Sequence, residues 1–193
     1  FATLAKVAYL TQKDSKPAVH TLGYTKSVLV DHKGAECLIV ENSERVVLAF
    51  RGTEPTEFSD IKADLKAWKR KSKTWGMVHA GFYEYLGRIW EQVEAYINTP
   101  ARKKKELYIC GHSLGGAMAA LAASRLQDRV VACYTYGQPR VGGRVWASKC
   151  TFEHHRYVNN NDIVPRVPFA VMGFRHRGEL HYINYYGYIR KMT

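Results

Sequence analysis

The chain has 193 residues, 46% of them hydrophobic, which is enough for one domain with a substantial core. No run within these residues approaches the apolar length of a membrane-spanning helix, and no shift in composition marks a second domain. The 29 Lys and Arg residues outnumber the 17 Asp and Glu residues, which gives a formal net charge of +12. These numbers exclude a helical membrane span within the sequence and favour a single basic domain.

The positive charge is concentrated in residues 62–73 and 102–105. Two interpretations fit this pattern: a solvated face that keeps the protein soluble, or a face that makes transient contact with an anionic membrane or lipid surface. No zinc-finger, RNP or helix-turn-helix signature accompanies the charge, so no nucleic-acid partner is expected.

The cysteines show no CxxC or other metal-binding spacing, and three of them lie in apolar, strand-like runs. They are Cys37, Cys110, Cys133 and Cys150. We interpret them as buried free thiols, which favours a cytoplasmic compartment, with secretion as the alternative. The sequence predicts no metal site and no cofactor.

The first third of the chain is predicted to contain one helix and a hairpin. Residues 1–12 carry apolar side chains at helical spacing, whereas residues 15–34 are mixed in character and interrupted by Pro17. Two strand-like runs then follow, residues 36–40 and 45–50, joined by a short polar turn. We expect this pair to form a hairpin that leads into the sheet.

The hairpin leads into Arg51-Gly52-Thr53, a flexible turn just past a strand, where open α/β sheets place their ligand-binding loops. Residues 54–70 carry an apolar stripe at helical spacing, with lysines largely on the opposite side. This segment is expected to be either a mobile lid over a cleft or an ordinary surface helix. Residues 83–97 form a clearer amphipathic helix, which we interpret as scaffold.

The stretch GHSLGG carries the strongest functional signal. Residues 106–110 are suited to a buried strand and residues 114–126, rich in alanine and leucine, to a helix. A serine between such a strand and helix must sit on a sharp, strained turn. Gly111 and Gly115 lack the Cβ atoms that would clash there, so Ser113 is expected at the exposed tip of the turn.

The remaining elements alternate between strands and helices. A strand over residues 130–136, a short helix over 143–149 and a strand over 155–158 precede the polar loop 159–162. This alternation predicts an α/β fold with a mostly parallel central sheet and helices on both faces.

A serine nucleophile needs a histidine to accept its proton and a carboxylate to orient that histidine. In α/β-hydrolases the three follow in the order Ser, Asp or Glu, His. Asp162 comes after Ser113, at the end of a later strand, and is the best candidate for the acid. Three other carboxylates fit less well: Asp128 lies at a helix end, Glu153 at the start of a strand and Glu179 in a basic stretch.

These residues resemble the class 3 lipases, a family of α/β-hydrolase fold typified by fungal triacylglycerol lipases. The resemblance extends from Val46 to about Ile183. Its landmarks are FRGT at residues 50–53, VHAGF at 78–82, GHSLGGAMA at 111–119, YGQPRVG at 136–142 and NNNDIVPRVP at 159–168. It implies one α/β-hydrolase domain over residues 1–193 that lacks its C-terminal end.

The resemblance also assigns roles to individual residues. It implies that Ser113 is the nucleophile and Asp162 the acid of the triad, and that Thr53 and the Leu114 N–H group form the oxyanion hole. It places a helical lid just after the oxyanion loop, which matches residues 54–70.

The catalytic histidine of the family is the one feature without a clear match. In the family it follows a GF-x-H-x-GE segment that corresponds here to residues 173–179. We therefore expect the base to lie beyond Thr193, with His176 and His181 as the alternatives. Four other histidines are expected to be structural: His79, His112, His154 and His155.

Together the residues and the resemblance predict a serine ester hydrolase, a lipase or esterase that cleaves lipid esters through an acyl-serine intermediate without a metal or cofactor. Triacylglycerols, short-chain esters and anionic phospholipids, the last through phospholipase A-type activity, all remain open as substrates. The alternative from a different class is a catalytically inactive binding module with the lipase fold.

Overall fold

A computed structural model of the chain describes residues 1–53 and 68–192. The segment predicted to be a lid or surface helix, residues 54–70, lies almost entirely outside the described residues. Its last two residues belong to strand β4 (Lys69–Lys71), which pairs with β5 (Met77–His79) in a small antiparallel sheet. No described helix is both long enough and apolar enough to cross a membrane.

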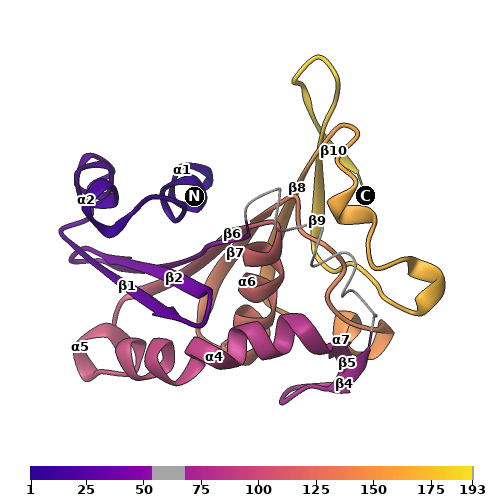
Figure 1. Cartoon of the computed structure of the whole chain (residues 1–193), viewed down its shortest axis with the longest axis horizontal. Helices are drawn as coiled ribbons and strands as arrows, with labels where there is room; N and C mark the ends of the chain where they lie inside the picture. Colours follow the sequence, from indigo (N-terminus) through magenta and orange to yellow (C-terminus); the bar gives the residue numbers. More distant parts are fainter. Residues whose placement is uncertain (54–67, 193) are drawn as a thin grey trace.

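Within the described residues, the main sheet has eight strands (Figure 1). In spatial order they are β1 (Lys26–His32), β2 (Ala35–Glu41), β3 (Arg45–Phe50), β6 (Glu106–His112), β7 (Val130–Tyr136), β8 (Glu153–Asn159), β9 (Glu179–Ile183) and β10 (Ile189–Met192). The five strands from β3 to β9 are parallel, whereas β1, β2 and β10 join the edges as antiparallel strands. The predicted mostly parallel sheet is confirmed.

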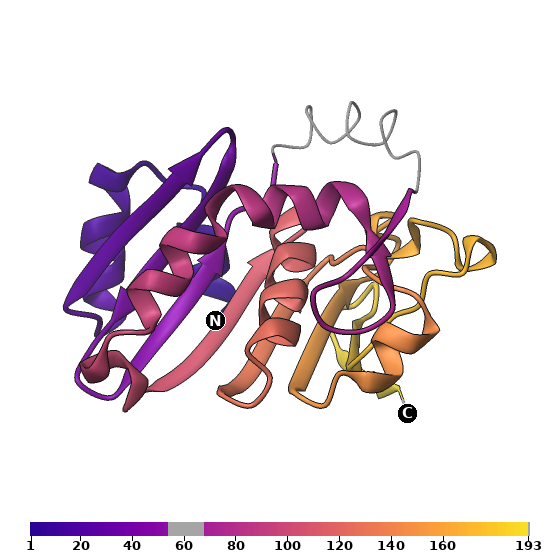
Figure 2. The ribbon, with the colours of Figure 1, turned by 90° about the horizontal axis from the view of Figure 1, so that it is seen from below.

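Helices cover both faces of this sheet, as predicted (Figures 1 and 2). The described helices are α1 (Ala2–Val7), α2 (Gln12–Thr21), α4 (Ala80–Ile97), α5 (Pro100–Lys103), α6 (Leu114–Arg125) and α7 (Arg144–Lys149), with 3-10 turns at Val164–Arg166 and Ala170–Met172. Helices α1 and α2 pack on one face, and α4, α6 and α7 pack on the other. Alternate residues of β2 and β3 point to the two faces, so each face has its own core.

The structure corrects the prediction for residues 15–34, which contain most of α2 and all of β1. Pro17 lies inside α2, where its ring and missing N–H group ordinarily disfavour a helix. Two features offset that cost: Thr11 caps the helix by accepting a hydrogen bond from the Asp14 N–H group, and Val19 is buried in the core.

The predicted strands and helices within residues 106–158 agree closely with β6, α6, β7, α7 and β8, whereas β4, β5, α5, β9 and β10 were not predicted. Helix α4 begins at Ala80 rather than at residue 83, because the His79 side chain caps it by accepting a hydrogen bond from the Phe82 N–H group. All four cysteines are buried free thiols, as expected. Burial raises the pKa of the Cys110 thiol to about 12, so it stays protonated and unreactive.

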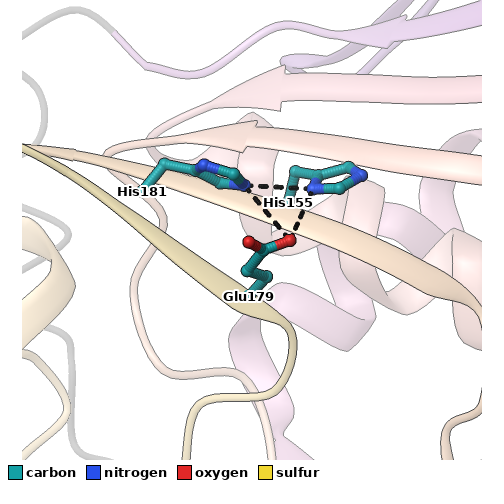
Figure 3. Close-up of side chains that lie close together, drawn as sticks. All are labelled: His155, Glu179 and His181. Atoms are coloured by element: carbon teal, nitrogen blue, oxygen red, sulfur yellow. Dashed lines mark hydrogen bonds and ion pairs between the residues drawn. The ribbon is translucent and has the colours of Figure 1, made fainter. Parts of the chain in front are cut away.

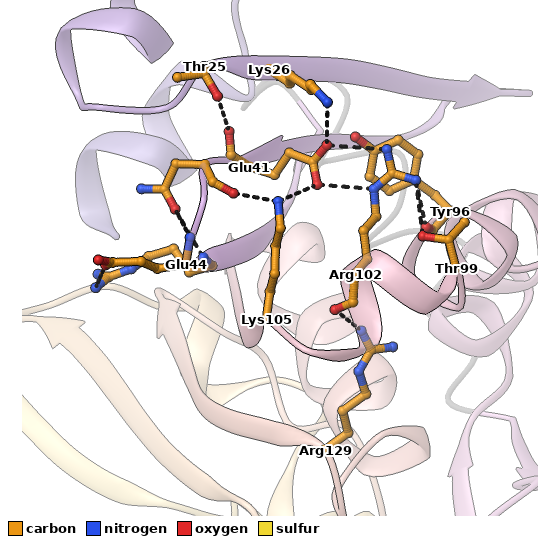
Figure 4. Close-up of polar contacts among 11 residues, drawn as sticks. Thr25, Lys26, Glu41, Glu44, Tyr96, Thr99, Arg102, Lys105 and Arg129 are labelled. Carbon is orange, nitrogen blue, oxygen red and sulfur yellow. Dashed lines mark hydrogen bonds and ion pairs between the residues drawn. The ribbon is translucent and has the colours of Figure 1, made fainter.

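A buried carboxylate ties the hairpin to helix α5 (Figure 4). Glu41, at the end of β2, is only 2% exposed and accepts hydrogen bonds from Arg102 at 3.0 and 3.2 Å and from Lys105 at 3.3 Å. Lys26 lies 3.8 Å from the same carboxylate. Part of the basic cluster at residues 102–105 is therefore used inside the fold rather than presented to a partner.

Candidate active site

Ser113 occupies the strained turn that the sequence predicts, between the end of β6 and the start of α6. Its φ of 55° and ψ of −124° are unusual for a residue with a side chain. The turn is tight, because a Cβ atom on Gly111 would lie 2.3 Å from the Gly115 carbonyl oxygen, and one on Gly115 would lie 2.2 Å from the Phe50 carbonyl oxygen. Only glycine fits at these two positions.

The loop after β3 passes directly beside this turn. A Cβ atom on Gly52 would lie 2.5 Å from the His112 carbonyl oxygen and 3.3 Å from the Cβ atom of Ser113. The next residue, Thr53, has a buried hydroxyl oxygen with no hydrogen-bond partner in the described part of the chain. An unpartnered buried hydroxyl is costly, which suits a group that a ligand would satisfy.

Helix α6 begins at Leu114, the residue that follows Ser113. The first N–H groups of a helix have no intrahelical acceptor, and the helix dipole places partial positive charge at this end. The start of helix α6 and the Gly52-Thr53 loop therefore both lie next to Ser113.

Asp162 lies in the loop after β8, close to the same end of the sheet. Its Oδ1 atom accepts a hydrogen bond of 2.9 Å from the Val164 N–H group, which fixes the carboxylate. Its Oδ2 atom lies against the backbone of Gly137, only 2.7 Å from where a Cβ atom of that residue would stand. The Ser113 N–H group donates a hydrogen bond of 2.9 Å to the carbonyl oxygen of Tyr136, the residue before Gly137. Both candidate triad residues therefore contact the backbone at the carboxyl end of β7.

His112 also lies at this point of the fold. Its Nδ1 atom and the Tyr9 hydroxyl are 2.8 Å apart. Burial lowers the pKa of His112, and the negative charge of Asp162 opposes that shift. Tyr9 is a site residue that sequence reasoning missed, since no motif in the first 45 residues singles it out.

The structure does not bring either alternative histidine to Asp162. The His176 Nε2 atom lies 2.7 Å from the Pro165 carbonyl oxygen, and burial lowers the pKa of His176 to about 3. His181 lies on β9 and contacts His155 instead. Among the described residues, no histidine is hydrogen-bonded to Asp162.

A cavity of about 760 Å³ opens beside the Asp162 carboxylate. It is lined by His112, Tyr136, Gly137, Tyr157, Asn159, Asn160, Asn161, Asp162, Ile183, Asn184 and Tyr185. A smaller cavity of about 380 Å³ also borders His112 and lies next to Thr53 and α1, and its wall is mostly apolar. The first has room for an imidazole ring next to the acid, and the second suits a hydrocarbon group next to the oxyanion loop.

Comparison with known proteins identifies the family. The model of the lipase (class 3) family matches residues 47–172, which is more than half of the chain. The chain belongs to the class 3 lipases. The match includes Thr53, Ser113, Leu114 and Asp162, although their individual roles stay predictions.

Two relatives show how much of a longer protein this class 3 lipase chain matches. It is 33% identical to the toxin TseL of Vibrio cholerae over 187 aligned positions, which cover 74% of this chain and 29% of TseL. It is 30% identical to a lipase of Rhizomucor miehei over 173 positions, which cover 82% of this chain and 47% of that lipase. The chain thus spans about half or less of the length of these curated relatives.

Solved structures confirm the predicted α/β-hydrolase fold. The lipase of Rhizopus microsporus var. chinensis superimposes with a TM-score of 0.77 at 25% identity, covering 94% of this chain and 71% of that one. A triacylglycerol lipase whose catalytic centre is formed by a serine protease triad gives a TM-score of 0.76 at 25% identity, with coverages of 95% and 77%.

Proposed function

We propose that the protein is a serine ester hydrolase that cleaves lipid esters through an acyl-serine intermediate. The observation that carries this proposal is the strained Ser113 turn, with the Thr53 loop packed beside it and the first turn of α6 behind it. The turn places Ser113 beside the loop that carries Thr53, although its side chain is buried, only 5% exposed, rather than at an exposed tip as the sequence predicted. It costs conformational energy that a merely structural serine would not require.

In the proposed mechanism, the Ser113 Oγ atom forms a bond to the ester carbonyl carbon while its proton passes to a histidine. The N–H groups of Thr53 and Leu114, supplemented by the Thr53 hydroxyl, bind the oxygen that becomes negative. The histidine then protonates the departing alcohol as its C–O bond breaks. Water attacks the acyl-serine by the same route and releases the carboxylic acid.

The histidine in this mechanism comes from outside residues 1–193 and enters the 760 Å³ cavity beside Asp162. Two observations support this part of the proposal: Asp162 has no histidine partner among the described residues, and the curated relatives are about twice as long as this chain or longer. Asp162 would hold the ring in the tautomer that can accept the serine proton and would stabilise the imidazolium that forms.

The substrate class proposed is a lipid ester with an apolar acyl group. The mostly apolar cavity next to Thr53 supports it, because an acyl chain there would place its carbonyl oxygen near the oxyanion loop. The exposed cations of β4, Lys69, Arg70 and Lys71, support transient contact with an anionic lipid surface. Activity on anionic vesicles should then fall as ionic strength rises.

The test is labelling of the full-length protein with a fluorophosphonate, followed by mapping of the modified residue. We expect labelling at Ser113 and loss of at least about 10³-fold in kcat for a p-nitrophenyl ester in the Ser113→Ala and Asp162→Asn variants. Ser43→Ala, which changes an exposed serine in the β2–β3 turn, is the matched control and should retain full activity. A Ser113→Ala variant that is labelled or hydrolyses esters like the wild type would refute the proposal.

A further inference from the structure

Among the described residues outside the candidate active site, one cluster of side chains has the composition of a metal site (Figure 3). His155 lies on β8, directly opposite Glu179 on the neighbouring parallel strand β9, and His181 follows Glu179 by two residues. Alternate residues of a strand point to the same face, so all three side chains converge on one side of the sheet.

The three candidate ligand atoms form a nearly regular triangle. The His155 Nδ1 and His181 Nε2 atoms are 3.0 Å apart, and the Glu179 Oε2 atom lies 3.4 and 3.7 Å from them respectively. In a tetrahedral zinc site with bonds of about 2.1 Å, neighbouring ligand atoms are about 3.4 Å apart. The point in the plane of the triangle that is equidistant from the three atoms lies about 2.0 Å from each, so an ion just above it would reach all three at bonding distance.

A fourth residue, Glu153, orients the His155 ring for metal binding. The Glu153 carboxylate lies 2.6 Å from the His155 Nε2 atom, on the side of the ring that faces away from the cluster. With its proton held on Nε2 by this carboxylate, His155 has a lone pair on Nδ1, the atom that faces His181 and Glu179; without an ion this lone pair accepts a hydrogen bond from the His181 Nε2–H group, and a bound ion would take the place of that proton. Carboxylates that bind the distal nitrogen of a ligating histidine are characteristic of zinc sites.

The surroundings hold these side chains in place. The His155 ring stacks on Tyr134 with ring centroids 5.0 Å apart, and the His181 ring stacks on Tyr157 at 4.6 Å. His181 is buried, whereas the Glu179 side chain is 38% exposed, so water can reach the open side of the triangle as a fourth ligand. The rings are therefore already oriented before any ion arrives.

We propose that His155, Glu179 and His181 bind a divalent transition-metal ion, best Zn²⁺, with water as the fourth ligand. Two imidazoles and one carboxylate favour Zn²⁺ over Mg²⁺ and Ca²⁺, which prefer oxygen ligands. The ion would tie β8 to β9 on the face that continues through Tyr157 to the cavity beside Asp162. The ion takes no part in the proposed ester hydrolysis.

The Lys191 side chain competes with a bound metal ion for the Glu179 carboxylate. The Lys191 ammonium group on β10 lies 3.0 Å from the Glu179 Oε1 atom, while Oε2 faces the histidines. The Lys191 side chain is largely exposed, so it can remain on Oε1 or move into solvent when the metal binds. Its removal should therefore strengthen metal binding, which is the opposite of the effect expected from loss of a ligand.

The test is metal titration of full-length, untagged protein after treatment with a chelator. Calorimetry should give one Zn²⁺ per chain at this site with a micromolar or lower Kd, and Co²⁺ should produce the visible absorption of a tetrahedral complex that Zn²⁺, but not Mg²⁺, abolishes. His155→Gln and Glu179→Gln should remove the absorption. Glu153→Gln should raise the Kd by about 10-fold to 100-fold, and Lys191→Ala should lower it by up to about fivefold.

Two controls make the result decisive. His32→Gln removes an exposed histidine on β1 and should leave the affinity unchanged, and Ser113→Ala should bind Zn²⁺ normally because the site is independent of the proposed hydrolase activity. Absence of the cobalt spectrum in the wild type would overturn the proposal. The proposal would also be overturned if His155→Gln and Glu179→Gln bound Zn²⁺ as tightly as the wild type, because the ion would then be bound by other residues.

Discussion

Replacing Gly115 with alanine places a methyl group against the backbone at the most crowded point of the Ser113 turn. The new Cβ atom would lie 2.2 Å from the Phe50 carbonyl oxygen and 2.7 Å from the Arg51 carbonyl carbon, whereas ordinary contact begins at 3.4 Å. Both obstructing atoms belong to the backbone and cannot rotate away. The end of β3 must therefore move by about 1 Å relative to α6.

This displacement is expected to affect both stability and catalysis. Overpacking of this kind costs about 1–3 kcal/mol, and the backbone clash places Gly115→Ala at the upper end of that range. The Thr53 loop follows the end of β3 directly, so its donors would move away from the oxyanion. A misplacement of about 1 Å can lower kcat by about 10²-fold.

Gly87→Ala is the matched control, because this glycine also lies in a helix but has no atom within 4 Å of its Cβ position. There the same substitution should stabilise the protein by about 0.5–1 kcal/mol. The measurements are the denaturant midpoint and kcat for a soluble p-nitrophenyl ester, on the full-length protein. The reasoning is refuted if Gly115→Ala keeps the wild-type midpoint and kcat, or if Gly87→Ala is equally damaging.

Three further predictions rest on buried polar groups. Glu41→Gln should lower the free energy of unfolding by about 3 kcal/mol, measured by chemical denaturation, because it leaves the partly buried cations in Figure 4 without their carboxylate. Burial lowers the pKa of His79 to about 4 and that of His176 to about 3, both below the value of about 6.5 in an unfolded chain. The unfolded state therefore binds more protons, so stability should be complete above about pH 6.5 and fall as the pH drops towards 4, as thermal unfolding across that range would show. Thr53→Val removes the buried hydroxyl, which has no hydrogen-bond partner among the described residues, but keeps the N–H group, and should lower kcat by up to about 10²-fold with little change in KM.

Each of these predictions has a control and a contrary outcome. Glu44→Gln, at an exposed site in the same hairpin, should leave the unfolding free energy within about 0.5 kcal/mol of the wild type. His176→Asn should flatten the pH dependence, and a wild type equally stable at pH 7 and pH 4 would contradict the assignment. Thr53→Ser should restore kcat, whereas equal losses in the valine and serine variants would show that packing, not the hydroxyl, matters.

Sequence reasoning was most successful where structure depends on neighbours in the chain. The strand, turn and helix around Ser113 follow from a buried apolar run, two glycines and an alanine-rich stretch, and all three are present. It failed for α2, because the pattern treats Pro17 as a helix breaker, while burial of Val19 against the sheet compensates for the proline. Strand β1 was missed because it lies at the sheet edge and is mostly exposed, so no apolar pattern marks it.

By itself the sequence determined the strained serine turn, the order of the candidate triad residues and the alternation that builds the sheet, since steric demands and periodicity act over a few residues. Only the tertiary structure decided which groups meet across strands. It set the Asp162 carboxylate against the end of β7, joined Tyr9 to His112, and brought two Glu-x-His pairs, at 153–155 and 179–181, onto one face. Those contacts depend on strand order and register, which are fixed by the packing of the whole sheet and not by any local pattern.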